Sequence, residues 1–274
     1  MLEYLQTIYS YTFMQKALIV GILVSLCSSL LGVTLVLKRY SMIGDGLSHV
    51  AFGSLCIALA LNLAPLKLAI PVVVIAAFLL LKVNNKSKFN GDSAIALISS
   101  ASMAIGIIAA SSSDGLNVDV NGYMFGSIYA ISDEYYLTAV IAFPVLLAVY
   151  ILLYNRIFAI TFDEPFAKAT GTKTSRLNTV IALMTAITIV IGMKIMGAIL
   201  ISSLIAFPAV SSMRVFKSYK GVVLSSAILS VFCLVAGITL SFVLSVPAGA
   251  CIVAVNAVML AVMCVLGTLV KKRS

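Results

Sequence analysis

Long apolar runs separated by short polar links make up most of the 274-residue chain. An apolar run of about 17–25 residues is long enough to cross the hydrocarbon core of a bilayer as a helix. The pattern predicts nine such helices, near residues 17–37, 46–63, 66–82, 93–111, 137–154, 177–193, 195–213, 222–244 and 247–270. We therefore expect an all-α polytopic membrane protein, with residues 1–274 forming a single transmembrane domain.

Composition agrees with this architecture. Hydrophobic residues make up 62% of the chain and charged residues only 10%, whereas a soluble domain usually has about 25% charged residues. The formal net charge of +9 is also typical of nucleic-acid-binding proteins. Here, however, the basic residues lie in short clusters between apolar runs, as membrane orientation requires. No nucleic-acid partner is expected.

The basic clusters indicate how the chain is oriented in the membrane. They fall on alternate links, near residues 38–39, 82–88, 156–176, 214–220 and 271–273. The intervening link 112–136 has four acidic residues and no basic one. Because basic residues collect on the cytoplasmic side, the N-terminus is predicted to lie outside and the C-terminus in the cytoplasm.

One pair of ionisable residues enters an apolar run. His49, the single histidine of the chain, follows Asp45 by four residues, which is about one helical turn, so both side chains share a helix face. Ionisable groups within a spanning segment cost about 2.5–3.5 kcal/mol each on insertion scales and usually serve a function. A carboxylate oxygen beside an imidazole nitrogen suits a divalent transition metal. We expect Asp45 and His49 to be metal ligands.

Two ligands do not complete a transition-metal shell, which normally has four or more. Cys56 lies seven residues after His49 on roughly the same helix face and is a weaker candidate. The other weaker candidates are Ser48, Asn256 in the last apolar run, and water. A shell finished by water suits a pathway that must bind its ion and release it.

Two links differ from the rest. Link 112–136 contains an apolar patch, Tyr123-Met124-Phe125-Gly126, which is expected to form a short interfacial helix or a lid at the outer mouth of a pathway. Link 155–176 is predicted to be cytoplasmic and to contain a short helix. Asp163 or Thr161 would cap this helix, Pro165 suits its first turn, and Gly171 suits the residue after its end. Such a helix is either a docking surface or an amphipathic helix lying on membrane lipid.

Five stretches of the sequence resemble one protein family, in order along the chain. They are LKRYSMIGDGLSHVAFG, GYMFGSIYAIS, FDEPFAKATG, KIMGAILISSLIAFPAVSS and SVPAGACIV. Together they resemble the permease subunit of manganese/zinc/iron ABC importers (the ABC-3 family), over residues 16–270. The resemblance implies a homodimer with the type II, vitamin-B12-importer-like fold in the bacterial plasma (inner) membrane. It also implies two cytoplasmic ATP-hydrolysing subunits and an extracytoplasmic metal-binding protein as partners.

The resemblance assigns roles to particular residues. It makes Asp45 and His49 metal-coordinating residues of the translocation pathway. It makes the predicted short cytoplasmic helix a coupling helix that fits a groove on the ATPase, through Asp163, Glu164, Pro165, Phe166, Ala167 and Gly171. No permanently bound cofactor is implied, and the transported metal is Mn²⁺ or Zn²⁺, with Fe²⁺ a further candidate. The chain departs from the family pattern at Gly46, where alanine is common, and at Phe52-Gly53-Ser54, which lacks a proline often found after the histidine.

The sequence also bears on the energy source and on two rival classes of protein. No Walker A motif occurs, since Gly171-Thr172-Lys173-Thr174 lacks the Gly-Lys pair, so energy comes from a partner subunit or from an ion gradient. The alternative function is therefore a gradient-driven secondary metal/proton transporter with Asp45 and His49 as a proton relay. An intramembrane protease is not expected: a single histidine excludes the HExxH zinc motif, and an aspartyl protease needs two carboxylates. The chain is predicted not to be an enzyme.

Overall fold

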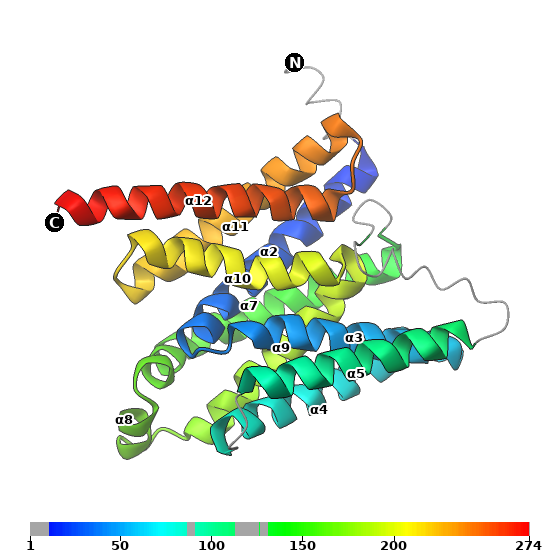
Figure 1. The fold of residues 1–274 in the computed structure, drawn as a ribbon, viewed down its shortest axis with the longest axis horizontal. Helices are drawn as coiled ribbons and strands as arrows, with labels where there is room; N and C mark the ends of the chain where they lie inside the picture. The colour runs from blue at the N-terminus through cyan, green and yellow to red at the C-terminus, as the bar shows by residue number, and fades with distance from the viewer. Residues whose placement is uncertain (1–10, 87–90, 113–125, 127–130, 274) are drawn as a thin grey trace.

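The computed structural model describes residues 11–86, 91–112, 126 and 131–273. In these ranges the chain is helical and contains no strand, which confirms the predicted all-α class. The helices are α2 (Thr12–Leu37), α3 (Ser41–Ala60), α4 (Pro65–Lys86), α5 (Gly91–Ser111), α7 (Asp133–Phe162), α8 (Glu164–Ala169), α9 (Thr174–Met196), α10 (Ala198–Val215), α11 (Tyr219–Leu244) and α12 (Ala248–Arg273) (Figure 1).

Eight helices within the described residues are long and apolar enough to cross a membrane. The apolar part of α4, Pro65–Leu80, is shorter than the length expected of a span. The prediction of about nine transmembrane helices is thus close to the structure. Many large apolar side chains of these helices face outward, with Leu152 82% exposed. This is the arrangement of a protein whose solvent is lipid.

Several helix boundaries differ from the predicted ones. Helix α7 continues to Phe162 rather than ending near residue 154, so the link predicted at 155–176 begins only at Asp163. The apolar run is interrupted at Arg156, but the helix continues because Ile157 and Ile160 pack into the buried core. The break between α9 and α10, the sixth and seventh of the predicted helices, lies at Gly197, three residues later than predicted.

Helix α3, which bears Asp45 and His49, occupies a central place in the bundle. In Figure 1 it lies between α5 and α10, with α2 crossing behind the layer that these helices form. It packs against α4, α5, α9 and α10, and α12 lies beyond α10, against α10 and α11. The short helix α8 lies at the end of the bundle where α3 begins (Figure 1). The candidate ligands and the predicted coupling helix are therefore at the same end.

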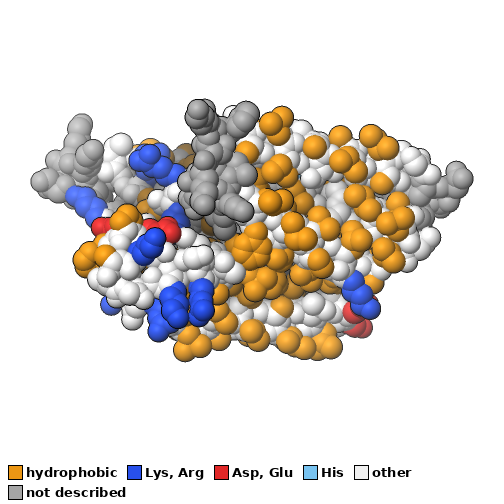
Figure 2. Space-filling view, turned by 90° about the horizontal axis from the view of Figure 1, so that it is seen from below, with side chains coloured by type: hydrophobic (Ala, Val, Ile, Leu, Met, Phe, Trp, Pro, Cys, Tyr) orange, Lys and Arg blue, Asp and Glu red, His pale blue; other side chains and the backbone are white. Residues whose placement is uncertain are grey.

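Charge is distributed unevenly along the bundle. On the face shown in Figure 2, Lys and Arg side chains gather at one end, while apolar side chains cover most of the rest. The described basic residues Arg156, Lys173 and Arg176 lie beside α8, around a surface hollow. The predicted cytoplasmic end is therefore a strongly basic surface.

Candidate metal site and coupling helix

Asp45 and His49 form the core of the candidate metal site. They lie in the second and third turns of α3, and His49 Nε2 is 3.7 Å from Asp45 Oδ2. Two ligand atoms about 2.1 Å from one tetrahedral ion are about 3.4 Å apart, so a small adjustment lets both side chains hold a single ion. The Asp45 side chain is 53% exposed and that of His49 27%. The pair therefore lies at the surface of a single chain.

Glycines on either side of Asp45 explain why this face of α3 is open. A Cβ on Gly46 would lie 2.5 Å from the Ile95 side chain of α5, and a Cβ on Gly44 would lie 3.2 Å from the Ile205 side chain of α10. Successive helical residues point about 100° apart, so Asp45 points between these two contacts. The helices α5 and α10 thus flank the candidate site without covering it.

The weaker ligand candidates lie elsewhere. Cys56 is fully buried in the hydrophobic core. The buried Ser48 hydroxyl donates to the Gly44 carbonyl at 2.8 Å, within its own helix. Asn256 is buried on α12, where its amide donates to the Ile252 carbonyl at 2.9 Å. Among the described residues, no group of three or more His, Cys, Asp or Glu side chains is placed to hold a metal ion.

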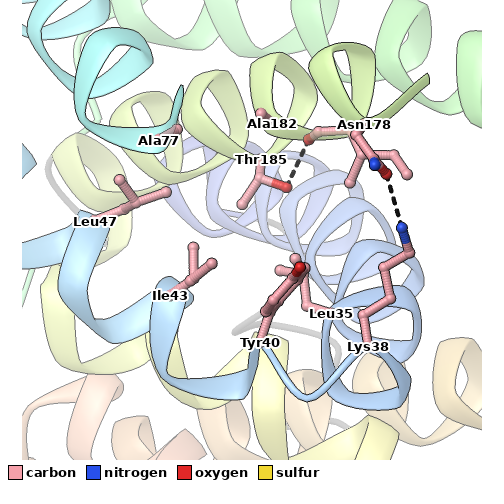
Figure 3. A pocket seen from close by; sticks show the side chains of 10 residues that line it. Leu35, Lys38, Tyr40, Ile43, Leu47, Ala77, Asn178, Ala182 and Thr185 are labelled. Carbon is pink, nitrogen blue, oxygen red and sulfur yellow. Dashed lines mark hydrogen bonds between the residues drawn. The ribbon is translucent and has the colours of Figure 1, made fainter. Parts of the chain in front are cut away.

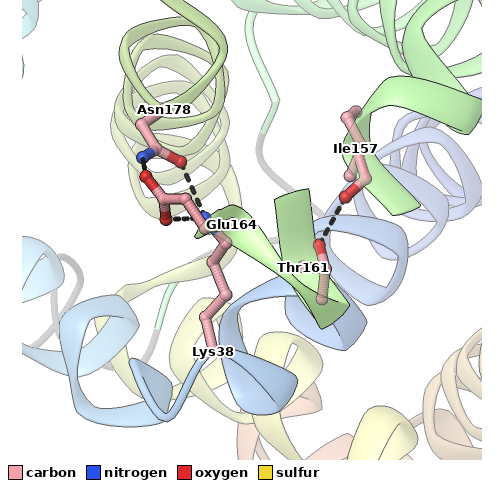
Figure 4. Close-up of polar contacts among 5 residues, drawn as sticks. All are labelled: Lys38, Ile157, Thr161, Glu164 and Asn178. Carbon is pink, nitrogen blue, oxygen red and sulfur yellow. Dashed lines mark hydrogen bonds and ion pairs between the residues drawn. The ribbon is translucent and has the colours of Figure 1, made fainter. Parts of the chain in front are cut away.

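The short helix α8 has the predicted ends. The Asp163 carboxylate accepts a hydrogen bond from the Phe166 amide at 2.9 Å, which makes Asp163 the N-cap, and Pro165 lies in the first turn. Gly171, with φ +86°, follows the helix, and the Gly171 amide donates to the Lys168 carbonyl at 3.1 Å. This is the left-handed helix end that favours glycine. The Thr161 hydroxyl donates instead to the carbonyl of Ile157 (Figure 4), so Asp163 is the cap.

The two faces of α8 differ. Ala167 is fully buried against the rest of the chain, whereas Phe166 is 64% exposed. An exposed aromatic ring on a well-capped helix is typical of a docking surface.

Glu164 at the start of α8 takes part in a cluster that sequence reasoning missed. Lys38 is the residue directly after α2. Its ammonium donates to Asn178 Oδ1 at 2.7 Å and lies 3.4 Å from Glu164 Oε2. The Asn178 amide of α9 donates to Glu164 Oε1 at 2.8 Å (Figure 4). Burial lowers the pKa of Lys38 from its ordinary value, and the nearby Glu164 carboxylate opposes that shift. We call Lys38, Glu164 and Asn178 the Lys38 cluster.

Of the predicted outer lid, only Gly126 lies within the described residues; Tyr123, Met124 and Phe125 lie outside them. Gly126 adopts φ +75°, and a Cβ there would lie 2.1 Å from the Met196 carbonyl oxygen. Gly126 thus lies against the α9–α10 break, at the end of α9 opposite to α8. Lys16, near the start of α2, forms an ion pair with Asp133, the first residue of α7.

Comparison with known proteins decides the family. A model described as the ABC 3 transport family matches residues 10–267. The chain belongs to this family. The resemblance predicted from the five sequence stretches is confirmed, and membership assigns the chain to transport rather than to catalysis.

Relatives in the family carry names that refer to metals. A probable metal transport system membrane protein of Thermotoga maritima is 30% identical over 254 residues, covering 92% of this chain and 89% of that protein. The manganese transport system membrane protein MntC of Halalkalibacterium halodurans is 28% identical, covering 92% and 86%. The high-affinity zinc uptake system membrane protein ZnuB of Haemophilus influenzae is 25% identical, covering 88% and 92%.

Solved structures share the fold. A chain of PsaBC from Streptococcus pneumoniae, solved in complex with a Fab, gives a TM-score of 0.85 at 24% identity, with 95% of this chain and 94% of that chain covered. An inward-facing metal-chelate type ABC transporter gives a TM-score of 0.74 at 17% identity, with 91% and 85% covered. The predicted fold of an ABC importer permease is thus confirmed.

Proposed function

We propose that this chain is the membrane permease subunit of an ATP-driven importer of a divalent transition metal, manganese or zinc, and that the metal passes a site built on Asp45 and His49. The observation that carries the proposal is the His49–Asp45 pair itself. The two ligand atoms lie 3.7 Å apart on an open face of a largely buried apolar helix. Family membership and the metals in the relatives' names support the same function.

The exposure of the pair supports a homodimer. Asp45 and His49 supply two ligand atoms, and no third acidic, histidine or cysteine ligand joins them among the residues that the structure describes. A second copy of the chain facing the open side of α3 would supply two more ligands and remove the pair from lipid. Four ligands then satisfy the ordinary coordination of zinc, and water completes a six-coordinate shell for manganese.

The chemistry of the site suits transport rather than storage. A thiolate among the ligands would hold zinc tightly, but Cys56 is buried within the core. Oxygen and nitrogen ligands accept manganese, zinc and iron alike, with affinity rising from manganese to zinc. Selection among these metals therefore belongs partly to the extracytoplasmic metal-binding protein that we propose as a partner.

ATP hydrolysis would act on the chain through α8. We propose that the exposed face of α8, with Phe166 at its centre, docks on the cytoplasmic ATPase. The basic end of the bundle then lies in the cytoplasm of a bacterial cell, with the C-terminus, and the N-terminus lies outside. The metal-binding protein would meet the opposite end, where Gly126 lies against the α9–α10 break.

The proposal is tested by metal uptake in a bacterial strain that lacks its own metal importers. The chain is expressed with and without its ATPase, as wild type, Asp45→Asn or His49→Gln. Uptake of manganese and zinc is expected to require the ATPase and to fall at least about tenfold in each variant, because even loss of an outer-sphere partner of a metal site commonly costs that much.

A matched control is Asp92→Asn, which alters a carboxylate in the first turn of the neighbouring helix α5. This variant is expected to leave uptake unchanged. Uptake that persists without the ATPase and follows the proton gradient would instead support the alternative, a secondary metal/proton transporter. Normal uptake in Asp45→Asn and His49→Gln, with the protein present in the membrane, would refute the proposed site.

A further inference from the structure

The turn between α2 and α3 joins the Lys38 cluster directly to the metal-site helix. The Arg39 amide donates to the Val36 carbonyl at 3.0 Å, and the Tyr40 amide donates to the Leu35 carbonyl at 2.7 Å. These two bonds close the end of α2 in the pattern known as a Schellman motif. Arg39 adopts φ +61°, a conformation that costs free energy for any residue with a Cβ. Such a turn is short and well fixed, so Lys38 moves together with the start of α3.

The Lys38 cluster connects this turn to α8 and α9. Its three side chains converge from three separate elements in Figure 4, and each is bonded to the other two. The Lys38 side chain is only 10% exposed. A buried ammonium separated from its carboxylate would be left uncompensated, which is strongly unfavourable. A displacement of Glu164 with α8 therefore tends to carry Lys38 with it.

A small cavity lies directly behind the cluster. It has a volume of about 20 Å³ and is lined by Lys38, Tyr40, Ile43, Leu47, Asn178 and Thr185, among others (Figure 3). Ile43 and Leu47 stand on the face of α3 roughly opposite Asp45, since residues two apart on a helix differ in direction by about 200°. Packing between α3 and α9 is thus incomplete here. The first turns of α3 have room to shift toward α9, and such a shift moves Asp45 as well.

We propose that the Lys38 cluster is the joint through which movement of α8 reaches the metal-site helix α3. The inference rests on the proposed function, in which the ATPase docks on α8. Lys38, Glu164 and Asn178 are positioning residues in this account, because none of them contacts the metal. Movement of α8 would shift the turn after α2, and with it Asp45, seven residues further along the chain than Lys38.

The test measures how much metal is transported per ATP hydrolysed. The complete complex of this chain with its ATPase and metal-binding protein is reconstituted in proteoliposomes, with Zn²⁺ or Mn²⁺ as the probe. Lys38→Met and Asn178→Leu are expected to keep the ATPase bound and hydrolysing ATP, while metal transported per ATP falls about tenfold, within the usual range of coupling energies between sites. Lys217→Met, which alters an exposed lysine on the link between α10 and α11, is the matched control and keeps the wild-type ratio.

A charge exchange tests the geometry of the cluster. In the double variant Lys38→Glu with Glu164→Lys, the Asn178 amide needs only to rotate by half a turn to donate to the new carboxylate and accept from the new ammonium. The double variant is expected to recover most of the metal-to-ATP ratio that Lys38→Glu alone loses. If the Lys38 side chain merely contacted the ATPase, the double variant would not recover the metal-to-ATP ratio.

Two results would overturn the inference. One is a wild-type ratio of metal to ATP in both Lys38→Met and Asn178→Leu. The other is a parallel loss of hydrolysis, ATPase binding and transport, which would make the cluster a structural support only. If Lys38→Met does not assemble, Asn178→Leu carries the same test, because it removes the bonds that α9 makes to both Lys38 and Glu164 and leaves no buried charge unpaired.

The result also separates this inference from the proposed function. If wild-type transport proves independent of ATP, the proposed function is refuted, and the proposed joint is refuted with it. If wild-type transport requires ATP and the cluster variants keep the wild-type ratio, only the joint is refuted.

Discussion

Asp45 and His49 obtain their geometry from helix periodicity alone, because residues four apart on α3 bring a carboxylate and an imidazole to 3.7 Å. The same periodicity argument made Cys56 a weaker candidate ligand. Tertiary packing, which the spacing cannot reveal, places Cys56 in the core and leaves Asp45 at the surface. The ligand pair thus depends on local spacing, while its accessibility depends on how α5 and α10 flank α3.

A residue-scale prediction separates Cys56 from the metal site. Cys56→Ala is expected to leave metal uptake within about twofold of wild type, since a buried core thiol behaves as a small apolar side chain. Uptake of both manganese and zinc is measured beside His49→Gln, which serves as the loss-of-function reference. A loss of uptake as large as that of His49→Gln, at equal amounts of protein in the membrane, would instead make Cys56 a ligand.

Two glycines with positive φ allow backbone strain to be separated from steric clash. Gly171 has φ +86° and nothing within 4 Å of an added Cβ, whereas a Cβ on Gly126 would meet the Met196 carbonyl oxygen at 2.1 Å. Gly171→Ala is expected to cost about 1–2 kcal/mol, the usual cost of a left-handed residue with a Cβ. Gly126→Ala should cost distinctly more. Thermal unfolding of the purified protein in detergent measures both, and equal losses would contradict the close contact at Gly126.

At the residue scale, sequence reasoning found the features that are local in the chain. Asp163 as N-cap and Gly171 after the helix follow from the preferences of single turns, and both are confirmed. Lys38 and Asn178 were missed because 140 positions separate them, and no spacing rule links residues so far apart. The polar Asn178 near the start of an apolar run was the only available signal.

At the element scale, α3 and α5 approach each other through residues with little or no side chain. A Cβ on Gly53 would lie 2.2 Å from the Ser102 carbonyl oxygen, and a Cβ on Gly106 would lie 2.5 Å from Gly53 Cα. Small residues permit such close backbone contact between membrane helices. The packing of α3 against α5 gives Gly53 a structural role.

Replacing Gly53 should therefore separate the two helices. Gly53→Ala is expected to destabilise the protein by about 1–3 kcal/mol, as overpacking generally does. Gly44→Ala on the same helix is the matched control, since its Cβ would meet only the Ile205 side chain, at 3.2 Å. Thermal unfolding in detergent distinguishes the two. A Gly53→Ala protein as stable as Gly44→Ala would show that α3 and α5 are not in close contact.

The capping of α8 gives a prediction about the coupling helix. Asp163→Ala removes the acceptor of the Phe166 amide and is expected to cost α8 about 1 kcal/mol, whereas Asp163→Asn keeps a good N-cap. Co-purification with the ATPase should fall for Asp163→Ala and remain near wild type for Asp163→Asn. An equal loss in both variants would indicate that the ATPase recognises the negative charge rather than the helix.

At the scale of the whole molecule, hydropathy predicted the helices well and their ends less well. The length of an apolar run reflects the thickness of the membrane and not the full length of the helix. Helix α7 continues past the charged Arg156 to Phe162, because its later turns still bury Ile157 and Ile160. The alternation of charge predicted which links share one end of the bundle. Which helix faces lie open, and hence where a second copy of the chain would dock, depends on the packing of all the helices together.

Transport in a fully reconstituted system tests the central claim most directly. Proteoliposomes containing the complex, with ATP on the ATPase side, are assayed for Zn²⁺ and Mn²⁺ accumulation with wild type, Asp45→Asn and His49→Gln. We expect accumulation against a gradient only in the wild type and only with ATP, with a loss of at least about tenfold in each variant. Accumulation that is equal in all three proteins, or that proceeds without ATP, would contradict the account.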